Sequence, residues 1–289
     1  MEIDNCLILS AGFGTRMGRV GKYLPKPLWK LGDSTYLKMQ YDLVRKIGFE
    51  NIHINISHQS IKIKKYLEEK GLKVISHYED SPLEVGGTIQ SLVNKGFSGS
   101  CLILNCDQLL HQGEKIINDL ILAHDEKHLA TLGSVEVDHN ESYNRLKVFK
   151  GSIVGVSKFG EHAPSNNFTY SGVGIVNFSR INSEEFSTSR NFFKLLFKNS
   201  ERNDIKMLKC KKSFFVDLGS KQKYLDFLFN SDYRDLRTEL NLEKYYESGF
   251  FNFSGEQWRG APPGSVIISG KQESFKRRSI YFDGIIDQY

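Results

Sequence analysis

Cysteine and proline are both scarce in this chain of 289 residues, which contains 4 Cys and 6 Pro. The cysteines include no CxxC pair; they are Cys6, Cys101, Cys106 and Cys210. So few cysteines cannot build a disulfide scaffold, and without paired spacing they predict no zinc site. We therefore expect a cytoplasmic protein, because thiols stay reduced in that compartment. The low proline content, with 25 Gly, also excludes a fibrous or low-complexity chain.

Long apolar runs are absent as well. No window approaches the roughly 20 apolar residues that a membrane-spanning helix needs. The start, MEIDNCLILS, has no basic segment ahead of a long apolar one. The sequence thus predicts neither membrane insertion nor a signal peptide, and it leaves peripheral attachment open.

The charge balance is only mildly basic. The chain has 39 Lys plus Arg against 34 Asp plus Glu, a formal net charge of +5 and a pI of about 8.8. Nucleic-acid-binding domains typically have a pI above roughly 9 with clustered charge. We therefore expect no nucleic-acid partner and interpret the basic run IKIKKYLEEK (61–70) as a solvated helix face. An anionic small substrate fits the same charge.

The first hundred residues alternate between the periods of strands and helices. Short apolar or alternating runs predict strands at 6–10, 51–56, 72–77 and 101–105. Helical spacing predicts helices at 36–47, 61–70 and 86–95. This succession predicts an α/β fold, a parallel sheet with right-handed crossovers.

The later pattern is less regular. Further helices are predicted at 115–124, 191–198 and 222–230, and further strands at 130–137, 146–156 (a hairpin turning at 150–151), 169–176 and 213–216. The segment 232–246 is charged and predicted to be helical. The aromatic, Gly-rich tail 250–289 predicts a small β element, a subunit contact or a segment that folds on binding. We thus expect a catalytic domain at 1–231 and a C-terminal extension at 232–289 whose role is open.

Unusual residues stand where two apolar strands end, the place where open α/β sheets bind ligands. The first strand runs into the Gly-rich turn SAGFGTRMG (10–18), whose amides and Arg16 suit an anion. Two prolines then flank Lys26 and stiffen its loop. Asp107 follows the strand 101–105, and Asp217 follows the apolar run 214–216. The two carboxylates could share one Mg²⁺ with substrate phosphates, although each alone could equally be a cap or turn residue.

Five motifs in this order resemble the sugar-1-phosphate nucleotidyltransferases. LILSAGFGTRMGRVGKYLPKPLWKLGD is similar to their N-terminal signature, and YEDSPLEVGGTIQS to their second Gly loop. LNCDQ and FFVDLGS resemble the two metal-aspartate motifs, and TYSGVGIVNFS the sugar-side strand. The resemblance covers about residues 5–225. It is closest to small bacterial uridylyltransferases and guanylyltransferases acting on N-acetylmuramate, mannose or heptose 1-phosphates.

The resemblance implies a Rossmann-like mixed, mainly parallel sheet with helices on both faces, and a role for each matching residue. Arg16 and Lys26 would be catalytic. The implied nucleotide-binding residues are Ala11, Gly12, Gly14, Thr15, Glu79, Gly86, Gly87 and Asp107, with Gly86 and Gly87 on a loop beside the base. The implied substrate-binding residues are Lys158, Gly172 and Asp217. Asp107 and Asp217 would hold Mg²⁺, and the partners would be an NTP and a phosphorylated small molecule. A homo-oligomer stays open.

The chain departs from the family pattern at several positions. Cys106 replaces the common Gly before the metal aspartate, which questions the local backbone geometry. On the substrate side, Asn144-Arg145 and Ser157-Lys158-Phe159 replace a common Tyr-Gly pair and a common Glu-Lys-Pro. These changes suggest an unusual acceptor. The alternatives are therefore a cytidylyltransferase for a non-sugar phosphate or a catalytically silent sugar-nucleotide-binding homologue.

Overall fold

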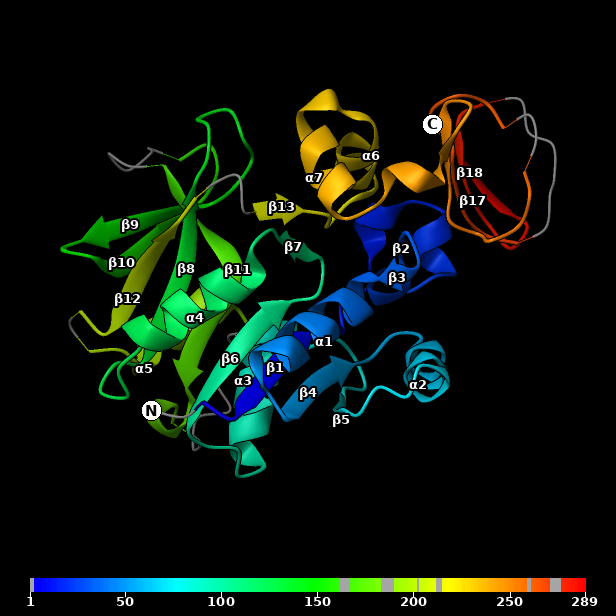
Figure 1. Ribbon diagram of the computed structural model, residues 1–289. Coiled ribbons are helices and arrows are strands. Elements are labelled where there is room, and N and C mark those ends of the chain that lie inside the picture. The colour runs from blue at the N-terminus through cyan, green and yellow to red at the C-terminus, as the bar shows by residue number, and fades with distance from the viewer. Residues whose placement is uncertain are drawn as a thin grey trace.

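A sheet of nine strands forms the centre of the molecule in the computed structural model, which describes residues 3–161, 167–182, 190–201, 203–211, 215–258, 261–270 and 277–289. The strands run in the order β5-β4-β1-β6-β11-β8-β12-β10-β9 across the sheet (Figure 1). In chain order they are β1 (Asn5–Leu9), β4 (Asn51–Ile56), β5 (Ile75–Tyr78), β6 (Ser100–Asn105), β8 (Ala130–Glu136), β9 (Arg145–Phe149), β10 (Ser152–Ser157), β11 (Phe168–Asn177) and β12 (Ile205–Cys210).

The half of the sheet built from the first hundred residues is parallel. β1 lies between β4 and β6 and is parallel to both, and β4 is parallel to β5. The other half is mixed, because β11 runs antiparallel to β6 and to β8, and β9 and β10 form an antiparallel hairpin. The predicted α/β fold with a mixed sheet is therefore confirmed.

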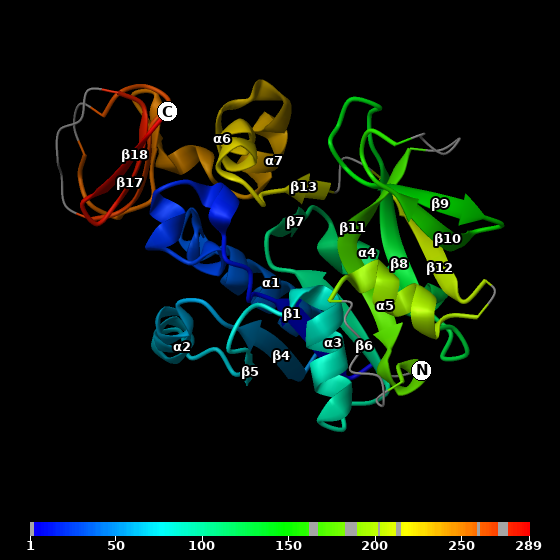
Figure 2. The ribbon, with the colours of Figure 1, turned by 180° about the vertical axis from the view of Figure 1, so that it is seen from behind.

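Helices cover both faces of this sheet. On one face α1 (Tyr36–Ile47) contacts α4 (Gly113–Ala123), and on the other α3 (Glu84–Asn94) contacts α5 (Phe192–Asn199); Figures 1 and 2 show the two sides. Successive strand residues point to opposite faces. Ile8 of β1 accordingly joins the core that contains the α1 residue Leu37, whereas Leu7 joins the core that contains the α3 residue Ile89. The outer helix α2 (Ser60–Glu69) packs on the first of these cores.

Two sequence predictions differ from the structure. β12 was not predicted, because its sequence IKMLKC has no regular alternation; pairing with β8 creates this strand. The prediction of a helix over 232–246 is wrong for most of that segment. Only α7 (Arg234–Glu239) is α-helical there, and Asn241, at a left-handed φ of 55°, prevents the helix from continuing. The predicted strand 213–216 appears as β13 (Phe215–Asp217); residues 213 and 214 lie outside the described part.

The C-terminal residues form a second sheet of five strands. In sheet order these are β14 (Tyr246–Glu247), β15 (Phe250–Asn252), β16 (Val266–Ser269), β17 (Ser279–Phe282) and β18 (Ile285–Gln288). The three inner strands are mutually parallel. Of the alternatives that the sequence left open for this region, a β element is the one observed.

This sheet packs against the N-terminal segment of the chain. Phe251, Phe253 and Val266 belong to the same buried cluster as Leu24 and Trp29. Figure 1 shows the orange-to-red sheet beside the blue N-terminal turns, with α6 (Lys221–Phe229) and α7 next to them. The C-terminal sheet therefore shares its core with the segment that carries the predicted phosphate loop. Within the described residues, every helix is too short or too polar to span a bilayer.

A buried histidine predicts how stability changes with pH. The ring nitrogens of His124 lie 2.9 Å from Ser100 Oγ and 3.0 Å from Thr131 Oγ1, and burial lowers the pKa of His124 to about 4. The unfolded chain protonates histidine near pH 6.5, so it binds the extra proton first. The stability that His124 contributes is therefore complete above pH 6.5 and is lost as pH falls toward 4. We expect a loss of about 2–3 kcal/mol from this residue, measured by urea unfolding across that pH range.

The control is His124→Gln. This variant should be less stable than the wild type at neutral pH, yet its stability should fall less steeply between pH 6.5 and pH 4. Burial also lowers the pKa of His53 to about 4, so the slope should decrease without vanishing. A variant with the wild-type slope would contradict the assignment to His124.

Candidate active site

Two aspartates meet where short strands leave the main sheet. Asp107 lies in the turn between β6 and β7 (Gln108–Leu110), and Asp217 ends β13, which pairs antiparallel with β7. The backbone N–H of Leu218 also donates to the carbonyl of Asp107 at 2.9 Å. The β7–β13 pairing therefore brings together two carboxylates that are 110 residues apart in the chain (217 minus 107).

Gly219 marks the point where these charges converge. A Cβ atom at Gly219 would lie 2.8 Å from Asp107 Oδ2, 2.8 Å from Asp217 Oδ1 and 3.0 Å from Arg16 Nη2. The two carboxylate oxygens are thus no farther apart than twice that distance. A side chain at position 219 would occupy the space between the two acidic groups and the guanidinium, which only glycine leaves open.

Lys26 completes the charged group. It begins the 3-10 turn η3 (Lys26–Leu28), directly after Pro25, whose extended backbone starts the turn. Its ammonium lies 2.5 Å from Asp107 Oδ2, and both side chains are largely buried. The sequence-predicted residues Arg16, Lys26, Asp107 and Asp217 are therefore brought together by the fold.

The predicted phosphate loop follows β1. Gly12 is exposed, and a Cβ placed on it would have no atom within 4 Å, so the backbone there is open to a ligand. Gly14 has a left-handed φ of 64° and precedes the 3-10 turn η1 (Thr15–Met17), which presents Thr15 and Arg16 on the surface. Glycine suits this position because other residues rarely adopt that conformation.

A cavity of about 360 Å³ lies at the carboxyl ends of β1, β4 and β6, beside these residues. Its walls contain five of the predicted site residues, which are Ala11, Gly12, Lys26, Glu79 and Asp107. Its position agrees with the rule that open α/β sheets bind ligands beyond the carboxyl ends of their strands.

Glu79 holds one wall of this cavity together. Its Oε1 accepts hydrogen bonds from Asn55 Nδ2 at 3.0 Å and from Thr88 Oγ1 at 2.6 Å, and its Oε2 accepts from the Leu83 N–H. Asn55 in turn accepts from the N–H of Ser10, the first residue of the Gly-rich turn. Both oxygens of the Glu79 carboxylate therefore accept hydrogen bonds from other residues of the protein. Through these bonds Glu79 fixes the position of the loop 79–83 in the cavity wall.

Gly86 and Gly87 lie in the first turn of helix α3, which confirms the helix predicted over 86–95 and differs from the loop that the resemblance implied. Both of their N–H groups donate to the carbonyl of Arg190. A Cβ on Gly86 would lie 2.7 Å from the carbonyl oxygens of Arg190 and Asn191. The glycine is therefore required for the close approach of the segment that leads into α5, and its amide faces that segment.

The two predicted residues on the acceptor side are placed differently from each other. Gly172 lies within strand β11, in agreement with the strand predicted over 169–176, at a register shift and with a φ of 79°. A Cβ there would lie 2.7 Å from Gln108 Oε1 and 2.8 Å from Asn105 Nδ2, so Gly172 lies against the turn that carries Asp107. Lys158 follows β10 with an exposed side chain, and its backbone N–H donates to Glu161. It lines neither the cavity at the carboxyl ends of β1, β4 and β6 nor the one beside Asp217.

Cys106 keeps an ordinary backbone despite replacing a glycine. Its φ is not positive, and its N–H donates to the carbonyl of Leu9 at 3.2 Å. Burial raises the pKa of the Cys106 thiol to about 12, so the thiol stays protonated. A residue with a side chain is therefore accommodated at this position without a left-handed backbone.

Sequence reasoning missed two partners of Asp217. The ammonium of Lys223 donates to Asp217 Oδ2, and the Tyr143 hydroxyl donates to the same oxygen at 3.1 Å. Burial raises the pKa of Asp217, but the hydrogen bond and charge of Lys223 outweigh it and hold the pKa below its ordinary value. The Lys223 contact could have been predicted from Ser220. Ser220 caps the N-terminus of α6 and so places Lys223 on its first turn, near Asp217.

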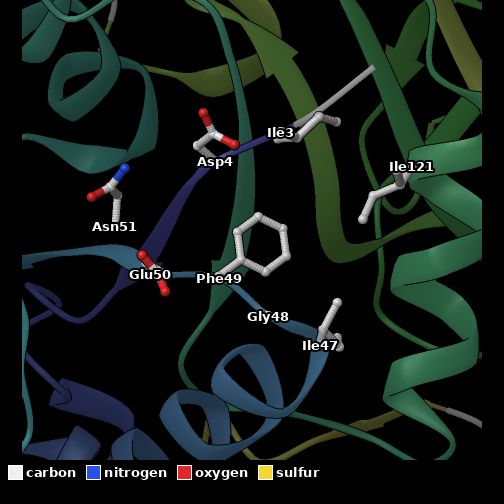
Figure 3. A pocket seen from close by; sticks show the side chains of 8 residues that line it. All are labelled: Ile3, Asp4, Ile47, Gly48, Phe49, Glu50, Asn51 and Ile121. Atoms are coloured by element: carbon white, nitrogen blue, oxygen red, sulfur yellow. The ribbon is translucent and has the colours of Figure 1, made fainter.

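A larger cavity of about 670 Å³ lies at the other end of the sheet, at the amino ends of β1 and β4. Figure 3 shows its lining, with the Phe49 ring between Ile121 and the carboxylates of Asp4 and Glu50. None of the sequence-predicted site residues lines it. Size alone therefore does not locate the site; the convergence of charged groups does.

Comparison with known proteins gives relatives of one chemical class. Residues 6–140 match the family model of the MobA-like NTP transferase domain. A D-glycero-alpha-D-manno-heptose 1-phosphate guanylyltransferase from Campylobacter jejuni is 26% identical over 243 residues, 78% of this chain and 99% of the relative. The solved inositol-1-phosphate CTP transferase from T. maritima has a TM-score of 0.65 at 16% identity, covering 83% of this chain and 96% of that one. The UDP-glucose pyrophosphorylase from Acinetobacter baumanii has a TM-score of 0.65 at 16% identity, covering 84% and 100%.

The chain is therefore a nucleotidyltransferase. More narrowly, its residues 6–140 match the model of the MobA-like NTP transferase domain. The resemblance to the sugar-1-phosphate nucleotidyltransferases, first based on five motifs, is thereby confirmed.

The different surroundings of two glycines give a testable contrast. Gly86→Ala should destabilise the fold by about 1–3 kcal/mol, because its Cβ would overlap the carbonyls of Arg190 and Asn191. Gly12→Ala should change the free energy of unfolding by no more than about 0.5 kcal/mol, because the space around it is open. Urea unfolding of both variants measures the difference. Equal stability of the two variants would show that the Gly86 contact is relieved at no cost.

Proposed function

We propose that this protein transfers a nucleoside monophosphate from an NTP to the phosphate of a sugar 1-phosphate and releases pyrophosphate. The observation that carries the proposal is the convergence of Asp107, Asp217 and Arg16 around Gly219, with Lys26 on Asp107. We assign this activity to a catalytic domain at 1–231. The proposed role of the C-terminal extension at 232–289 is to stabilise that domain, because it packs on the N-terminal segment. The Campylobacter jejuni relative bears the name of such an enzyme.

In the proposed reaction, an oxygen of the acceptor phosphate attacks the α-phosphorus of the NTP. The bond from that phosphorus to the oxygen bridging to the β-phosphate breaks, and pyrophosphate leaves with the electron pair. The attacking oxygen is already ionised at neutral pH, so no general base is required. Catalysis then depends on positioning and on neutralising charge. This accounts for a site made of cations, carboxylates and glycine amides.

The donor set at Gly219 suits Mg²⁺. Magnesium commonly takes one or two carboxylates together with substrate phosphate oxygens. Asp107 and Asp217 offer two carboxylates at one point, and the described residues contain no cluster of three or more His, Cys, Asp or Glu that could hold a metal without substrate. We propose these two aspartates as the ligands. The bound ion would neutralise phosphate charge.

The cations have separate proposed roles. Arg16, exposed above the carboxylates, would hold the phosphates through its planar donors and stabilise the charge that develops during transfer. Lys26, paired with Asp107 in the free protein, would exchange this partner for a phosphate oxygen. Ala11, Gly12, Gly14 and Thr15 would line the phosphates with backbone amides, and the loop held by Glu79 would lie beside the base.

The surroundings of Asp217 indicate the kind of acceptor. A cavity of about 220 Å³ next to it has three carboxylates in its walls, Glu141, Asp217 and Asp226, with Lys223 as the cation. Carboxylates accept hydrogen bonds from hydroxyls and repel a second anion. We therefore propose an acceptor with one phosphate and an uncharged, hydroxyl-rich body. Gly172 and Lys158 are proposed as substrate-binding residues on the resemblance alone, since neither lines this cavity.

The experiment that tests the function is pyrophosphate release with Mg²⁺, each NTP including dTTP, and a panel of sugar 1-phosphates. One NTP–sugar pair should turn over. Arg16→Ala and Lys26→Ala should each reduce kcat by roughly 10²–10³-fold, because each removes one charge-stabilising donor. Asp107→Ala should abolish turnover. Lys38→Ala and Asp42→Ala, which break an exposed pair on α1, are the matched controls and should leave kcat unchanged.

The second candidate is a cytidylyltransferase for a non-sugar phosphate. Its support is the altered segment 144–159 together with the hydroxyl-accepting cavity, since a polyol presents the same groups as a sugar. The panel therefore includes CTP with inositol 1-phosphate. Turnover of that pair and of no sugar 1-phosphate would favour the second candidate. Absence of both turnover and NTP binding, measured by calorimetry, would reject the proposed function and favour a silent homologue.

A further inference from the structure

The C-terminal sheet reaches the candidate active site through one carboxylate. Asp287 lies on β18 and is 7% exposed. Its Oδ2 accepts a hydrogen bond from the backbone N–H of Arg19 at 2.6 Å, and its Oδ1 accepts one from the Lys221 ammonium at 2.9 Å. Arg19 lies three residues after Arg16, and Lys221 lies four residues after Asp217. Asp287 therefore joins the segment that carries Arg16 to the segment that carries Asp217.

The fit around this carboxylate is close. A Cβ on Gly18 would lie 2.1 Å from Asp287 Oδ2 and 3.1 Å from Lys221 Cδ. Gly18 also has a left-handed φ of 72°. The signature segment (residues 7–33) therefore needs glycine here, both for its conformation and for the approach of Asp287. The guanidinium of Arg19 reaches the carbonyl of Ile286 at 3.5 Å. Backbone and side chain of the signature segment thus both contact β18.

Packing fixes the position of Asp287. Ile280 of β17, Val266 of β16 and Trp29 belong to one buried cluster, so the C-terminal sheet cannot shift freely against the signature segment. The Lys30 ammonium also donates to the carbonyl of Phe253 at 2.8 Å. Asp287 is therefore held by a packed core and can act as a fixed point for the two segments that it contacts.

We propose that Asp287 is a positioning residue for nucleotidyl transfer, which keeps the Arg16 segment in register with the Asp217 segment. The proposal rests on the proposed function, because the reacting phosphates would lie between those two segments. Arg16 Nη2 and Asp217 Oδ1 both approach Gly219, whereas Asp287 contacts neither of them. A displacement of about 1 Å in such a site can cost about 10²-fold in rate. A fixed distance between the segments therefore has catalytic value.

The chemistry of the contact favours this role over simple stabilisation. A buried ion pair must recover the cost of removing two charges from water, and well-packed apolar residues often stabilise a fold as well or better. A carboxylate with two fixed donors does supply a defined geometry, because each oxygen has one partner from a different segment. The C-terminal sheet would thus contribute to the enzyme by holding Asp287 in place between the two segments.

The test uses the full-length chain with Asp287→Asn. This variant keeps the size of the side chain but replaces one accepting oxygen with an N–H₂ group, so at least one of the two contacts is lost. The matched control is Asp283→Asn, which removes a carboxylate from the turn between β17 and β18, where Asp283 accepts a hydrogen bond from the Ser269 hydroxyl at 2.8 Å. Lys221→Met is the second variant, in case Asp287→Asn fails to fold.

Two measurements are made on each variant. The first is hydrogen exchange of the backbone amides at 15–22 and 217–224, which needs no substrate. We expect Asp287→Asn and Lys221→Met to raise exchange in both segments together, and Asp283→Asn to leave both unchanged. The second is steady-state kinetics with the NTP–acceptor pair that turns over. We expect kcat to fall by about tenfold and KM for the NTP to change by less than about threefold, because alignment is lost while the binding groups remain.

The outcomes separate this proposal from the proposed function. Wild-type exchange in both segments of the Asp287→Asn variant would overturn the positioning role, whatever the activity. Raised exchange with unchanged kcat would overturn its catalytic value. A wild-type protein that neither turns over any acceptor nor binds an NTP would reject the proposed function, whereas the exchange data would still show whether Asp287 joins the two segments. A rate loss that merely follows the folded fraction, measured by thermal unfolding, would also overturn the proposal.

Discussion

The convergence of two carboxylates and a guanidinium at Gly219 is the constraint on which the rest of the site depends. Like charges at this separation repel, so the fold must supply cations close by. Lys26 neutralises Asp107 and Lys223 neutralises Asp217 in the free protein. These pairs allow a cluster of acidic groups to exist before any substrate arrives. In the proposed reaction, Lys26 would exchange Asp107 for a phosphate oxygen.

The backbone around this cluster follows from the same constraint. The β7–β13 pairing fixes Asp217 opposite Gln108, one residue beyond Asp107. The Gly-rich turn is fixed separately, because Ser10 donates to Asn55, which in turn donates to Glu79. The cavity thus has one wall fixed by strand pairing and another fixed by a chain of buried side-chain hydrogen bonds. Buried networks of this kind impose a single geometry when every member is satisfied.

The C-terminal sheet extends this arrangement beyond the nucleotidyltransferase fold. Its aromatic residues share a core with Trp29 and Leu24, and Asp287 makes its polar contacts at the edge of that core. Apolar packing and the hydrogen bonds of Asp287 therefore both hold the C-terminal sheet against the N-terminal segment. A Cβ on Gly18 would overlap Asp287 of the sheet, and a Cβ on Gly32 would overlap the ring of Tyr245, which lies in the turn before β14. The N-terminal segment therefore packs closely against the C-terminal part of the chain.

The sequence alone determined the regular elements and the order of the site motifs. The helix 36–47 and the strand 51–56 were predicted to the residue, because hydrophobic period is a property of neighbouring positions. The aspartates 107 and 217, Arg16 and Lys26 were found for the same reason, since each stands in a short motif. Only the tertiary structure decided that Gly86 faces Arg190, that Lys223 and Tyr143 hold Asp217, that the tail forms a sheet, and that Asp287 reaches the signature segment. Each of these contacts joins positions far apart in the chain or turns a helix face toward a particular neighbour, and no local pattern encodes which distant segment will lie opposite.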